Sequence, residues 1–213
     1  MSNASATGVR HRPRQDRSAQ RYELILDTTA ALIDEVGYPA ITMTLVAKRA
    51  EMSGPGLYRY FDDLNGIAKA LAVRNLTRFM DEVNSLLADP DRDWPDALSA
   101  MVSVYADMYR TEPGFRWLRL GDSVSRTLID GTTSNKSVVA QHTADLFTVR
   151  YEVDYRPDLI EHIEALVEIA DALLAKAFET NPQGNDFFIN ETMRVINWYL
   201  AEYLARPYEL PKK

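Results

Sequence analysis

Apolar side chains recur every three or four residues along most of this chain, which is the spacing of one face of an α-helix. The clearest stretch runs from about Ser18 to Val36. Gly37 follows it, where a helix is often closed by a residue in the left-handed conformation. No segment alternates apolar and polar residues as a half-buried strand does, so the pattern predicts an all-α fold.

A second long helix is predicted after Phe61. Asp62 and Asp63 are suited to cap it, and its apolar positions continue to about Ala88. A helix of roughly 26 residues is about 39 Å long at 1.5 Å per residue. We therefore expect it to leave a small first unit and enter a larger second one, as a lever between them.

The rest of the chain predicts further helices separated by turn residues. Asp93 and Pro95 suit the cap and the first turn of one of them. The expected helical ranges are 94–110, 115–120, 136–153, 157–179 and 186–205, with a further short helix within 121–131.

The last two predicted helices, 157–179 and 186–205, carry apolar side chains over more than one face. A helix of this kind is buried on two sides, here against its own core and against a second subunit. The linker 181–185 makes the two an antiparallel pair. Two such pairs would form a four-helix interface, so we expect a homodimer through these helices.

Between the two long helices, residues 42–61 predict two short helices joined by a tight turn. Thr44 is expected to cap the first, whose apolar positions recur at helical spacing. Glu51, Met52 and Ser53 are too few for more than a turn, and Met52 is placed to fill the gap between the helices.

The second short helix is expected to begin at Ser53, with Pro55 in the first turn, where its missing N–H costs nothing. Leu57, Tyr58 and Phe61 form its inner side. The residues left outside are Gly54, Gly56, Arg59 and Tyr60. Short helix, turn and short helix is the helix-turn-helix pattern, whose second helix enters the major groove of DNA.

The residues in this stretch also follow a specific order. It runs Gly37-Tyr38, Thr42, Val46-Ala47, Ala50-Glu51-Met52-Ser53 and Leu57-Tyr58-Arg59-Tyr60-Phe61. This string closely resembles the tetracycline-repressor (TetR) family of bacterial regulators over residues 18–70, most specifically at its Leu-Tyr-x-Tyr-Phe ending. The family often has Lys and Gly where this chain has Gly54 and Pro55, and a phosphate-binding Lys where it has Leu64.

The resemblance implies a DNA-binding surface on and around the second short helix. The implied DNA-facing residues are Thr42, Thr44, Lys48, Ser53, Gly54, Pro55, Gly56, Tyr58, Arg59 and Tyr60. Arg59 is best suited to contact a base or a phosphate, and the tyrosine hydroxyls can bind phosphates. Gly54 and Gly56 have no side chain to read bases, so close approach of the backbone would matter there.

The charge distribution favours this surface, although the chain as a whole is acidic. The net charge is −7, but residues 1–60 carry +2 and residues 61–213 carry −9. Arg14, Arg17 and Arg21 lie in the basic stretch 10–21, and we expect them to reach the phosphate backbone. Residues 1–17 are expected to be a flexible basic arm, either a solvated tail or an arm that reaches a groove.

Composition excludes several classes of protein. The chain has no cysteine, which excludes disulfides and thiolate sites and suits a reducing cytosol. It has no apolar run of about 18 residues and no apolar segment behind its basic N-terminus, so we expect no membrane span and no secretion signal. We therefore expect a cytoplasmic protein, associated with the nucleoid when bound to DNA.

The sequence gives little support to a catalytic site or a metal site. His11, His142 and His162 lie in the expected tail and on two different helices. His142 and Asp145 can share a helix face and bind a metal or polar ligand, although a surface pair is the more ordinary interpretation. No phosphate-binding Gly-rich loop and no nucleophile–base spacing stands out. We expect no enzyme activity, no cofactor and no metal.

The larger second part of the chain holds large apolar side chains, mostly aromatic or sulfur-containing, spread over four helices. They are Phe79, Met80, Met101, Tyr105, Met108, Trp117, Leu118, Phe147 and Tyr151. Each can be plain core or can line an apolar small-molecule cavity. The TetR resemblance favours the cavity, because the second domains of that family usually bind an inducer. Such a lining would suit a flat or lipophilic effector.

Together these observations predict a ligand-responsive dimeric transcriptional regulator, with repression as the expected output. Its parts would be the arm 1–17, a helix-turn-helix domain 18–62, an effector-binding and dimerisation domain 63–205 and a tail 206–213. Two reading helices about 34–36 Å apart would engage successive major grooves of a palindromic operator. A small molecule would shift the dimer towards a spacing that no longer fits.

The alternative is a helical small-molecule-binding protein whose DNA-binding module is weak or vestigial. Leu64 in place of a phosphate-binding lysine favours this alternative, and so does the acidic net charge. A small helical enzyme is a third hypothesis, for which no catalytic cluster is apparent.

Overall fold

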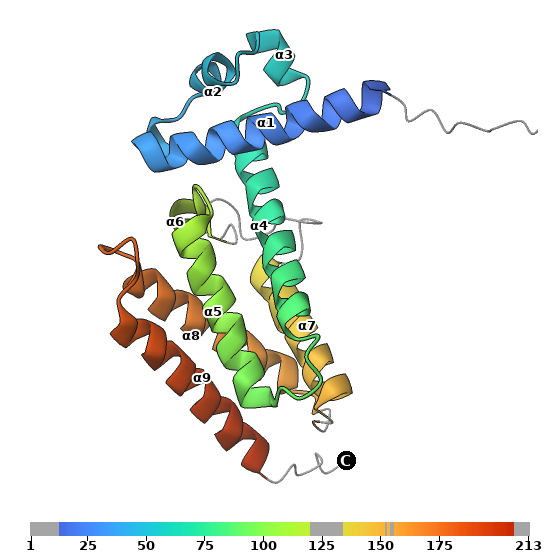
Figure 1. The fold of residues 1–213 in the computed structure, drawn as a ribbon, viewed down its shortest axis with the longest axis vertical. Coiled ribbons are helices and arrows are strands. Elements are labelled where there is room, and N and C mark those ends of the chain that lie inside the picture. The colour runs from blue at the N-terminus through green and yellow to red at the C-terminus, as the bar shows by residue number, and fades with distance from the viewer. Residues whose placement is uncertain (1–12, 120–133, 152, 154–155, 207–213) are drawn as a thin grey trace, which may run out of the picture.

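The computed structural model describes residues 13–119, 134–151, 153 and 156–206, with side chains from Arg17 onwards in these ranges. Every regular element in this part of the chain is a helix, so the predicted all-α fold is confirmed (Figure 1). The elements are α1 (Pro13–Val36), the 3₁₀ helix η1 (Tyr38–Ala40), α2 (Met43–Arg49), α3 (Gly54–Tyr58), α4 (Leu64–Leu86), α5 (Trp94–Thr111), α6 (Phe115–Leu118), α7 (Asn135–Arg150), α8 (Leu159–Ala177) and α9 (Asp186–Ala205). None of these described helices has the length and apolar character needed to cross a lipid bilayer.

Helices α1, α2 and α3 and the start of α4 form a small N-terminal unit at one end of the molecule. α1 lies across the end of α4, and α2 and α3 lie on the outer side of α1 (Figure 1). The core of this unit includes Ile33, Val46, Leu57 and Ile67, all fully buried. Gly37 closes α1 with a φ of 78°, and its N–H donates to the Ile33 carbonyl over 3.0 Å, as its position predicts.

α4 contributes to two hydrophobic cores. Near its start, Ile67 and Leu71 are buried in the core of the N-terminal unit. Further along, Leu76, Phe79 and Val83 are buried in the core of a larger C-terminal unit. Its 23 residues span about 34 Å at 1.5 Å per residue. The helix that the sequence suggests as a lever is therefore packed into both units.

Side-chain caps set the starts of the long helices where the sequence places them. Asp63 accepts from the Gly66 N–H over 2.7 Å at the start of α4. Asp93 accepts from the Asp96 N–H over 2.9 Å at the start of α5, with Pro95 in the first turn. These caps satisfy N–H groups that have no partner within the helix.

The C-terminal unit contains most of α4 together with α5, α7, α8 and α9, and in it α8 and α9 lie antiparallel (Figure 1). The turn between them depends on Gly184, which is buried with a φ of 86°. A Cβ there would lie 2.7 Å from Phe178 Cζ and 2.8 Å from Ile189 Cδ1. Asn185 then caps α9 by accepting from the Phe187 N–H over 3.0 Å. This close packing fixes the alignment of the two helices.

The short helix α6 makes a second connection between the two units. Gly114, just before it, has a φ of 73°, and a Cβ there would lie 3.2 Å from the Ala30 carbonyl oxygen of α1. Phe115 is buried in the core of the C-terminal unit, whereas Leu118 is buried in the core of the N-terminal unit. α6 is thus held by both cores at once.

α1 begins at Pro13 and not at Ser18, so residues 13–17, expected in the flexible arm, form its first turn. Proline suits the first helical position because its fixed φ is helical and no hydrogen bond is lost there. The rest of the expected arm, the helix expected within 121–131 and the tail after Arg206 lie outside the described residues.

α7 ends at Arg150, three residues before the expected end. The N–H groups of Tyr151 and Val153 both donate to the Phe147 carbonyl, over 3.1 and 3.3 Å, which closes the helix there.

Candidate DNA-binding face and ligand cavity

The sequence suggested that Thr44 caps the first short helix, α2. The cap is instead Thr42. Thr42 has an extended backbone, with φ −133° and ψ 155°, and its hydroxyl accepts from the Leu45 N–H over 3.2 Å. A cap lies just outside the helix, whereas Thr44 is already inside the first turn. Both threonines are exposed, and so is Lys48 one turn later.

The turn between α2 and α3 contains a strained residue that the sequence did not reveal. Glu51 adopts a φ of 54°, which residues other than glycine rarely take. The Met52 N–H donates to the Ala47 carbonyl over 2.9 Å, and the Met52 side chain packs against the core of the N-terminal unit. Met52 thus fills the gap between the helices, as expected, and helps to hold α3 in place.

The second short helix, α3, begins as predicted and ends after five residues. Ser53 Oγ accepts from the Gly56 N–H over 3.2 Å, and Pro55 lies in the first turn. Ser53, Gly54 and Pro55 are exposed, and Gly56 is partly exposed. The start of α3 is therefore open to a partner.

Helical spacing places Tyr58 on the inner side, but its side chain is 55 % exposed. α3 ends at Tyr58, and the N–H groups of Tyr60 and Phe61 both bind the Leu57 carbonyl. Phe61 therefore reaches the core through a turn, where it stacks on Tyr22 with 5.1 Å between ring centroids. Tyr60, expected outside, is half-buried against the same core.

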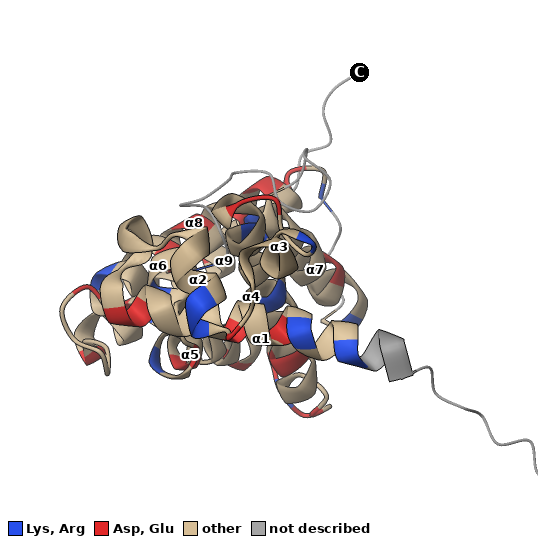
Figure 2. Ribbon diagram, turned by 90° about the horizontal axis from the view of Figure 1, so that it is seen from above, with Lys and Arg blue, Asp and Glu red and all other residues tan. Residues whose placement is uncertain are grey.

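The start of α1 and the end of α3 are far apart in the sequence but form one basic groove of about 330 Å³. It is lined by Arg17, Ser18, Arg21, Gly56, Arg59 and Tyr60. Seen from above in Figure 2, the basic positions of α1 lie towards its start. The structure thus brings three predicted DNA-binding arginines together. The side chain of the fourth, Arg14, lies outside the described part of the chain.

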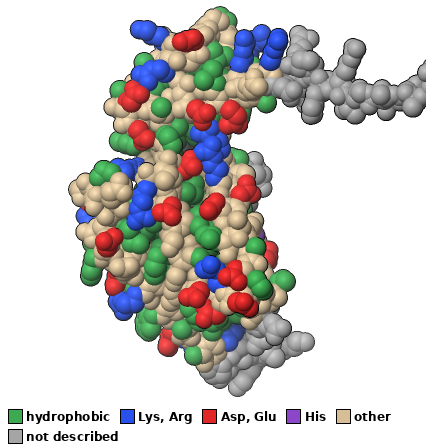
Figure 3. Space-filling model, viewed as in Figure 1, with side chains coloured by type: hydrophobic (Ala, Val, Ile, Leu, Met, Phe, Trp, Pro, Cys, Tyr) green, Lys and Arg blue, Asp and Glu red, His purple; other side chains and the backbone are tan. Residues whose placement is uncertain are grey.

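Three acidic side chains of α1 are engaged in ion pairs elsewhere on the unit. Glu35 accepts two 2.7 Å hydrogen bonds from Arg49, and these lower the pKa of the Glu35 carboxyl. Glu23 and Asp27 both bind Arg74 of α4, at 3.2 and 2.7 Å. In Figure 3 the acidic side chains of this unit lie mostly towards its junction with the C-terminal unit. Positive charge remains on the side that carries the groove.

The C-terminal unit has a partly open cavity of about 70 Å³ between α4, α5, α7, α8 and α9, with mostly apolar walls. Phe79, Met101 and Tyr105, three of the predicted ligand residues, line it. Much of the remaining wall comes from α7 and α8, including Val139, Thr143, Ile163, Leu166 and Leu174. The apolar residues of α8 were expected to serve core and dimer contacts, so their role in a cavity was missed.

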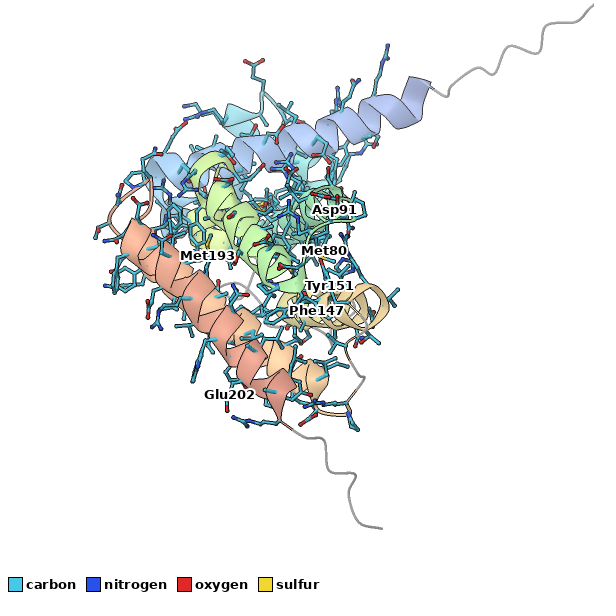
Figure 4. The ribbon with its side chains drawn as sticks, turned by 60° about the horizontal axis from the view of Figure 1, so that its bottom comes forward. Met80, Asp91, Phe147, Tyr151, Met193 and Glu202 are labelled. Atoms are coloured by element: carbon cyan, nitrogen blue, oxygen red, sulfur yellow. The ribbon has the colours of Figure 1, made fainter. Side chains whose placement is uncertain are left out.

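Other predicted ligand residues lie outside the cavity wall. Met108 is buried in the core, and Met80 lines a separate surface groove between α4, α7 and α8. Phe147 on α7 and Tyr151, just after the end of α7, lie side by side, with 5.2 Å between ring centroids (Figure 4). These four side chains serve packing around the cavity.

Trp117 and Leu118 are predicted ligand residues that the structure places away from the cavity. Trp117 is 49 % exposed, and Leu118 is buried in the core of the N-terminal unit. The reason is that α6 bridges the two units, so the C-terminal end of this short helix packs in the N-terminal unit.

Asp171 on α8 gives the cavity a polar end that the sequence analysis missed. It is buried, and the Tyr105 hydroxyl donates to its Oδ1 over 2.9 Å. Arg119 and Lys136 bind its Oδ2 at 2.7 and 2.9 Å. Burial, together with the charge of Asp171, raises the pKa of Tyr105 well above its usual value, so the hydroxyl stays protonated and donates. The sequence did contain a signal for this role, because Asp171 is a carboxylate within an otherwise apolar face of its helix.

Two family models cover most of the chain. Residues 25–71 match bacterial regulatory proteins of the tetR family, and residues 92–204 match the tetracyclin repressor-like C-terminal domain. A TetR-family transcriptional regulator from Streptomyces coelicolor is similar over 85 % of this chain and 98 % of its own, with 32 % identity and a TM-score of 0.73. The chain belongs to the TetR family of bacterial transcriptional regulators.

More distant TetR-like proteins agree with this assignment. A TetR-family regulator from Pectobacterium atrosepticum has 17 % identity and a TM-score of 0.66 over 92 % of this chain and all of its own, which shows the shared fold. YobS, an HTH-type transcriptional regulator of Bacillus subtilis, is 26 % identical over 44 % of this chain and 48 % of its own. The chain thus spans about half the length of that relative.

TetR-family proteins bind operator DNA and small molecules and form dimers, and they are regulators, which are not enzymes. The family resemblance drawn from the sequence is confirmed, and with it the helix-turn-helix DNA-binding class. Which residues of this TetR-family chain contact DNA or an effector stays a prediction.

The two glycines of α3 in this TetR-family protein differ in how much room they leave for a side chain. A Cβ at Gly54 would meet no atom within 4 Å, whereas one at Gly56 would lie 3.0 Å from the capping Ser53 Oγ. We expect Gly56→Ala to lower the melting temperature, because a cap contributes about 1 kcal/mol. Gly54→Ala should leave it unchanged or raise it slightly. Differential scanning calorimetry checks this, and equal midpoints for the two variants would contradict it.

Proposed function

We propose that this chain is a dimeric repressor that binds a palindromic operator and leaves it when a lipophilic small molecule occupies the C-terminal cavity. The observation that carries the proposal is the basic groove in which Arg17 and Arg21 of α1 meet Arg59 after α3. Proteins are held on DNA largely by neutralising phosphates, and this groove adjoins the helix that reads bases.

The exposed face of α3 is suited to the major groove of DNA, which is about 12 Å wide and admits a helix. Gly54, Pro55 and Tyr58 are exposed on α3, and Thr44 and Lys48 are exposed on the neighbouring α2. These side chains would contact base edges and the phosphates that border the groove. Backbone atoms at Gly54 can approach DNA closely, because no side chain intervenes.

The two capping hydroxyls, Thr42 and Ser53, are also suited to phosphate contact. Each accepts one backbone N–H, at 3.2 Å in both cases, and each residue is exposed. A hydroxyl that accepts a hydrogen bond can still donate its own hydrogen, here to a phosphate oxygen. Such contacts position a protein on DNA without reading its sequence.

Leu64 stands where the family often has a phosphate-binding lysine, but this departure has a structural explanation. Its side chain is half-buried and packs against the core of the N-terminal unit. The arginines of the basic groove supply positive charge instead. Leu64 therefore gives little support to the alternative of a small-molecule-binding protein with a vestigial DNA-binding module.

The proposed dimer surface lies on α8 and α9. Phe187 and Trp198 on α9 are 66 and 63 % exposed. They lie about three helical turns apart and therefore share one side of the helix. Large exposed apolar side chains on one face mark an interaction surface. A two-fold dimer through this face would present two α3 helices to one operator, about 34–36 Å apart.

The cavity suggests how an effector would act. Its volume of about 70 Å³ is well below the ~300–1,000 Å³ of ordinary ligand pockets. An effector must therefore move the walls apart, and one wall is Phe79 on α4, the helix shared with the N-terminal unit. A displaced α4 changes the spacing of the two α3 helices. A ligand that binds the opened form then favours the form that does not fit the operator.

We expect the purified protein to bind a preferred sequence selected from genomic DNA, with an affinity that falls steeply with salt. Arg17→Ala and Arg21→Ala should each reduce the slope of log association constant against log salt by about 1, because each removes one phosphate contact. Arg59→Ala should lower the affinity by about 1–3 kcal/mol if it reads a base, or reduce the slope similarly if it binds a phosphate. Fluorescence anisotropy at several salt concentrations measures both quantities.

Arg49→Ala is the matched control for these three variants. It removes the same charge from the same unit, but from a guanidinium that Glu35 holds. The DNA affinity of Arg49→Ala and the salt dependence of that affinity should stay close to those of the wild type. The proposal fails if no DNA is preferred, or if all four variants behave alike. Unchanged DNA affinity of Arg59→Ala/Tyr60→Ala would favour the small-molecule-binding alternative.

N-phenyl-1-naphthylamine, a neutral lipophilic fluorophore, tests the cavity. We expect its fluorescence to rise on binding and the affinity for operator DNA to fall as it binds. Ala170 lines the cavity, so Ala170→Leu should reduce both effects several-fold by filling the space. Ala88→Leu, at an exposed position beyond α4, is the control. Equal responses of the two variants would place the ligand site elsewhere.

Trp198→Glu tests the dimer surface. A charge at the centre of an apolar interface should shift the protein from dimer to monomer and lower operator affinity by about tenfold or more. Val149, which is 83 % exposed on α7, provides the control Val149→Glu. Sedimentation velocity measures the oligomeric state. A wild-type monomer, or a Trp198→Glu dimer, would exclude this interface.

A further inference from the structure

We propose that Asp171 is a positioning residue for the DNA-binding unit, and that it acts through Arg119 on the junction between α6 and α4. This inference rests on the proposed function, because it names the contact through which the cavity and the N-terminal unit are coupled. Asp171 and Tyr105 line the cavity, whereas Arg119 directly follows the helix that enters the N-terminal core.

Asp171 gathers side chains from three other parts of the C-terminal unit. Tyr105 of α5 donates to its Oδ1, and Arg119 after α6 and Lys136 of α7 bind its Oδ2. Only 8 % of the Asp171 side chain is exposed. A buried carboxylate whose partners come from separate elements holds those elements together, because losing a partner leaves a poorly compensated charge.

Arg119 is held in a backbone conformation that is rare for a residue with a side chain. Its φ is 46° and its ψ is −131°. Its N–H donates to the Phe115 carbonyl over 2.6 Å, and its own carbonyl accepts from Asn75 Nδ2 over 3.0 Å. Such conformations persist only where surrounding contacts determine them, and they occur in segments that switch. The ion pair with Asp171 is one of those contacts.

Asn75 places this junction at the point of α4 where the two cores meet. It is buried between Leu71, in the N-terminal core, and Leu76, in the C-terminal core. One turn earlier, the Ala72 carbonyl accepts from Asn135 Nδ2 over 3.3 Å, and Asn135 precedes Lys136 of the same cluster. The cluster around Asp171 therefore reaches α4 by two routes.

Leu118 carries the connection into the N-terminal unit. It is almost fully buried in the core of that unit, and the next residue is Arg119. Any movement of Arg119 must therefore be accommodated by the packing of α1 and α4 around Leu118. When an effector enlarges the cavity, it displaces Tyr105 or Asp171, Arg119 loses its fixed position, and α6 and α4 are released together.

The first test compares Asp171→Asn with Glu168→Gln. Asparagine keeps the shape of Asp171 but removes the charge that Arg119 and Lys136 bind. Glu168 binds the same Lys136 at 2.8 Å from an exposed position, so its variant removes an outer ion pair only. We expect Asp171→Asn to lower operator affinity by about 5- to 150-fold, the usual size of coupling between two sites. Glu168→Gln should leave the affinity unchanged.

A second measurement separates positioning from simple loss of stability. The chain has no cysteine, so nitroxide labels can be placed at Val36→Cys on α1 and Val149→Cys on α7, both exposed. Pulsed electron resonance, on labelled chains diluted with unlabelled protein, gives the distance between the two units. Asp171→Asn and Arg119→Met should each shift or broaden this distance at a temperature where both are folded. Arg119→Lys, which can still bind Asp171, should restore most of the wild-type distance and DNA affinity.

The outcomes distinguish this inference from the proposed function. If the wild type prefers no DNA, the proposed function fails. If the wild type binds an operator and Asp171→Asn melts earlier but binds equally well, the cluster is only structural and this inference is overturned. An unchanged distance in Asp171→Asn and Arg119→Met overturns it as well, even if DNA affinity falls.

Discussion

The whole molecule depends on one helix being buried in two hydrophobic cores. Ile67 and Leu71 anchor α4 in the N-terminal unit, and Leu76, Phe79 and Val83 anchor it in the C-terminal unit. Burying one large apolar side chain stabilises a protein by about 1.5–3 kcal/mol, so removing α4 from either core has a high cost in free energy. In the proposed mechanism, a change in the walls of the cavity would therefore be passed to the N-terminal unit as movement of a packed helix.

A local arrangement of charge reconciles an acidic chain with a DNA-binding role. The net charge is −7, yet Arg17, Arg21 and Arg59 line a single groove beside α3. Much of the acidic charge of α1 is engaged by Arg49 and Arg74. Exposed charges farther away than about 8 Å are largely screened at physiological salt, so in the proposed complex the groove would govern the contact with DNA.

Much of the fold was predictable because helices and their caps follow local rules. Gly37, Ser53, Asp63 and Asp93 end or begin helices as their positions indicate. The choice of Thr42 over Thr44 as the cap of α2 was not predictable, because both threonines fit the rule and only the backbone conformation decides. The sequence predicted that these arginines face DNA, but it could not show that Arg21 and Arg59, 38 residues apart, line the same groove.

The apolar nature of the cavity was predictable from the sequence, but only some of the residues that line it were. Phe79, Met101 and Tyr105 line it, but Leu118 belongs to the other core, because the place of a four-residue helix is decided by tertiary packing. The partners of Asp171 come from positions 105, 119 and 136, so no local pattern could reveal them. Sequence periodicity identifies which face of a helix is buried, but not what that face encloses.

The buried glycine between α8 and α9 has a consequence for which chains can pair. Gly184 leaves no room for a side chain beside Phe178 and Ile189, so the hairpin has a single register. A bacterium with several related repressors must keep them from forming mixed assemblies. In the proposed dimer, that discrimination would therefore fall to exposed side chains such as Phe187 and Trp198, because the packing around Gly184 leaves the hairpin itself little freedom to change.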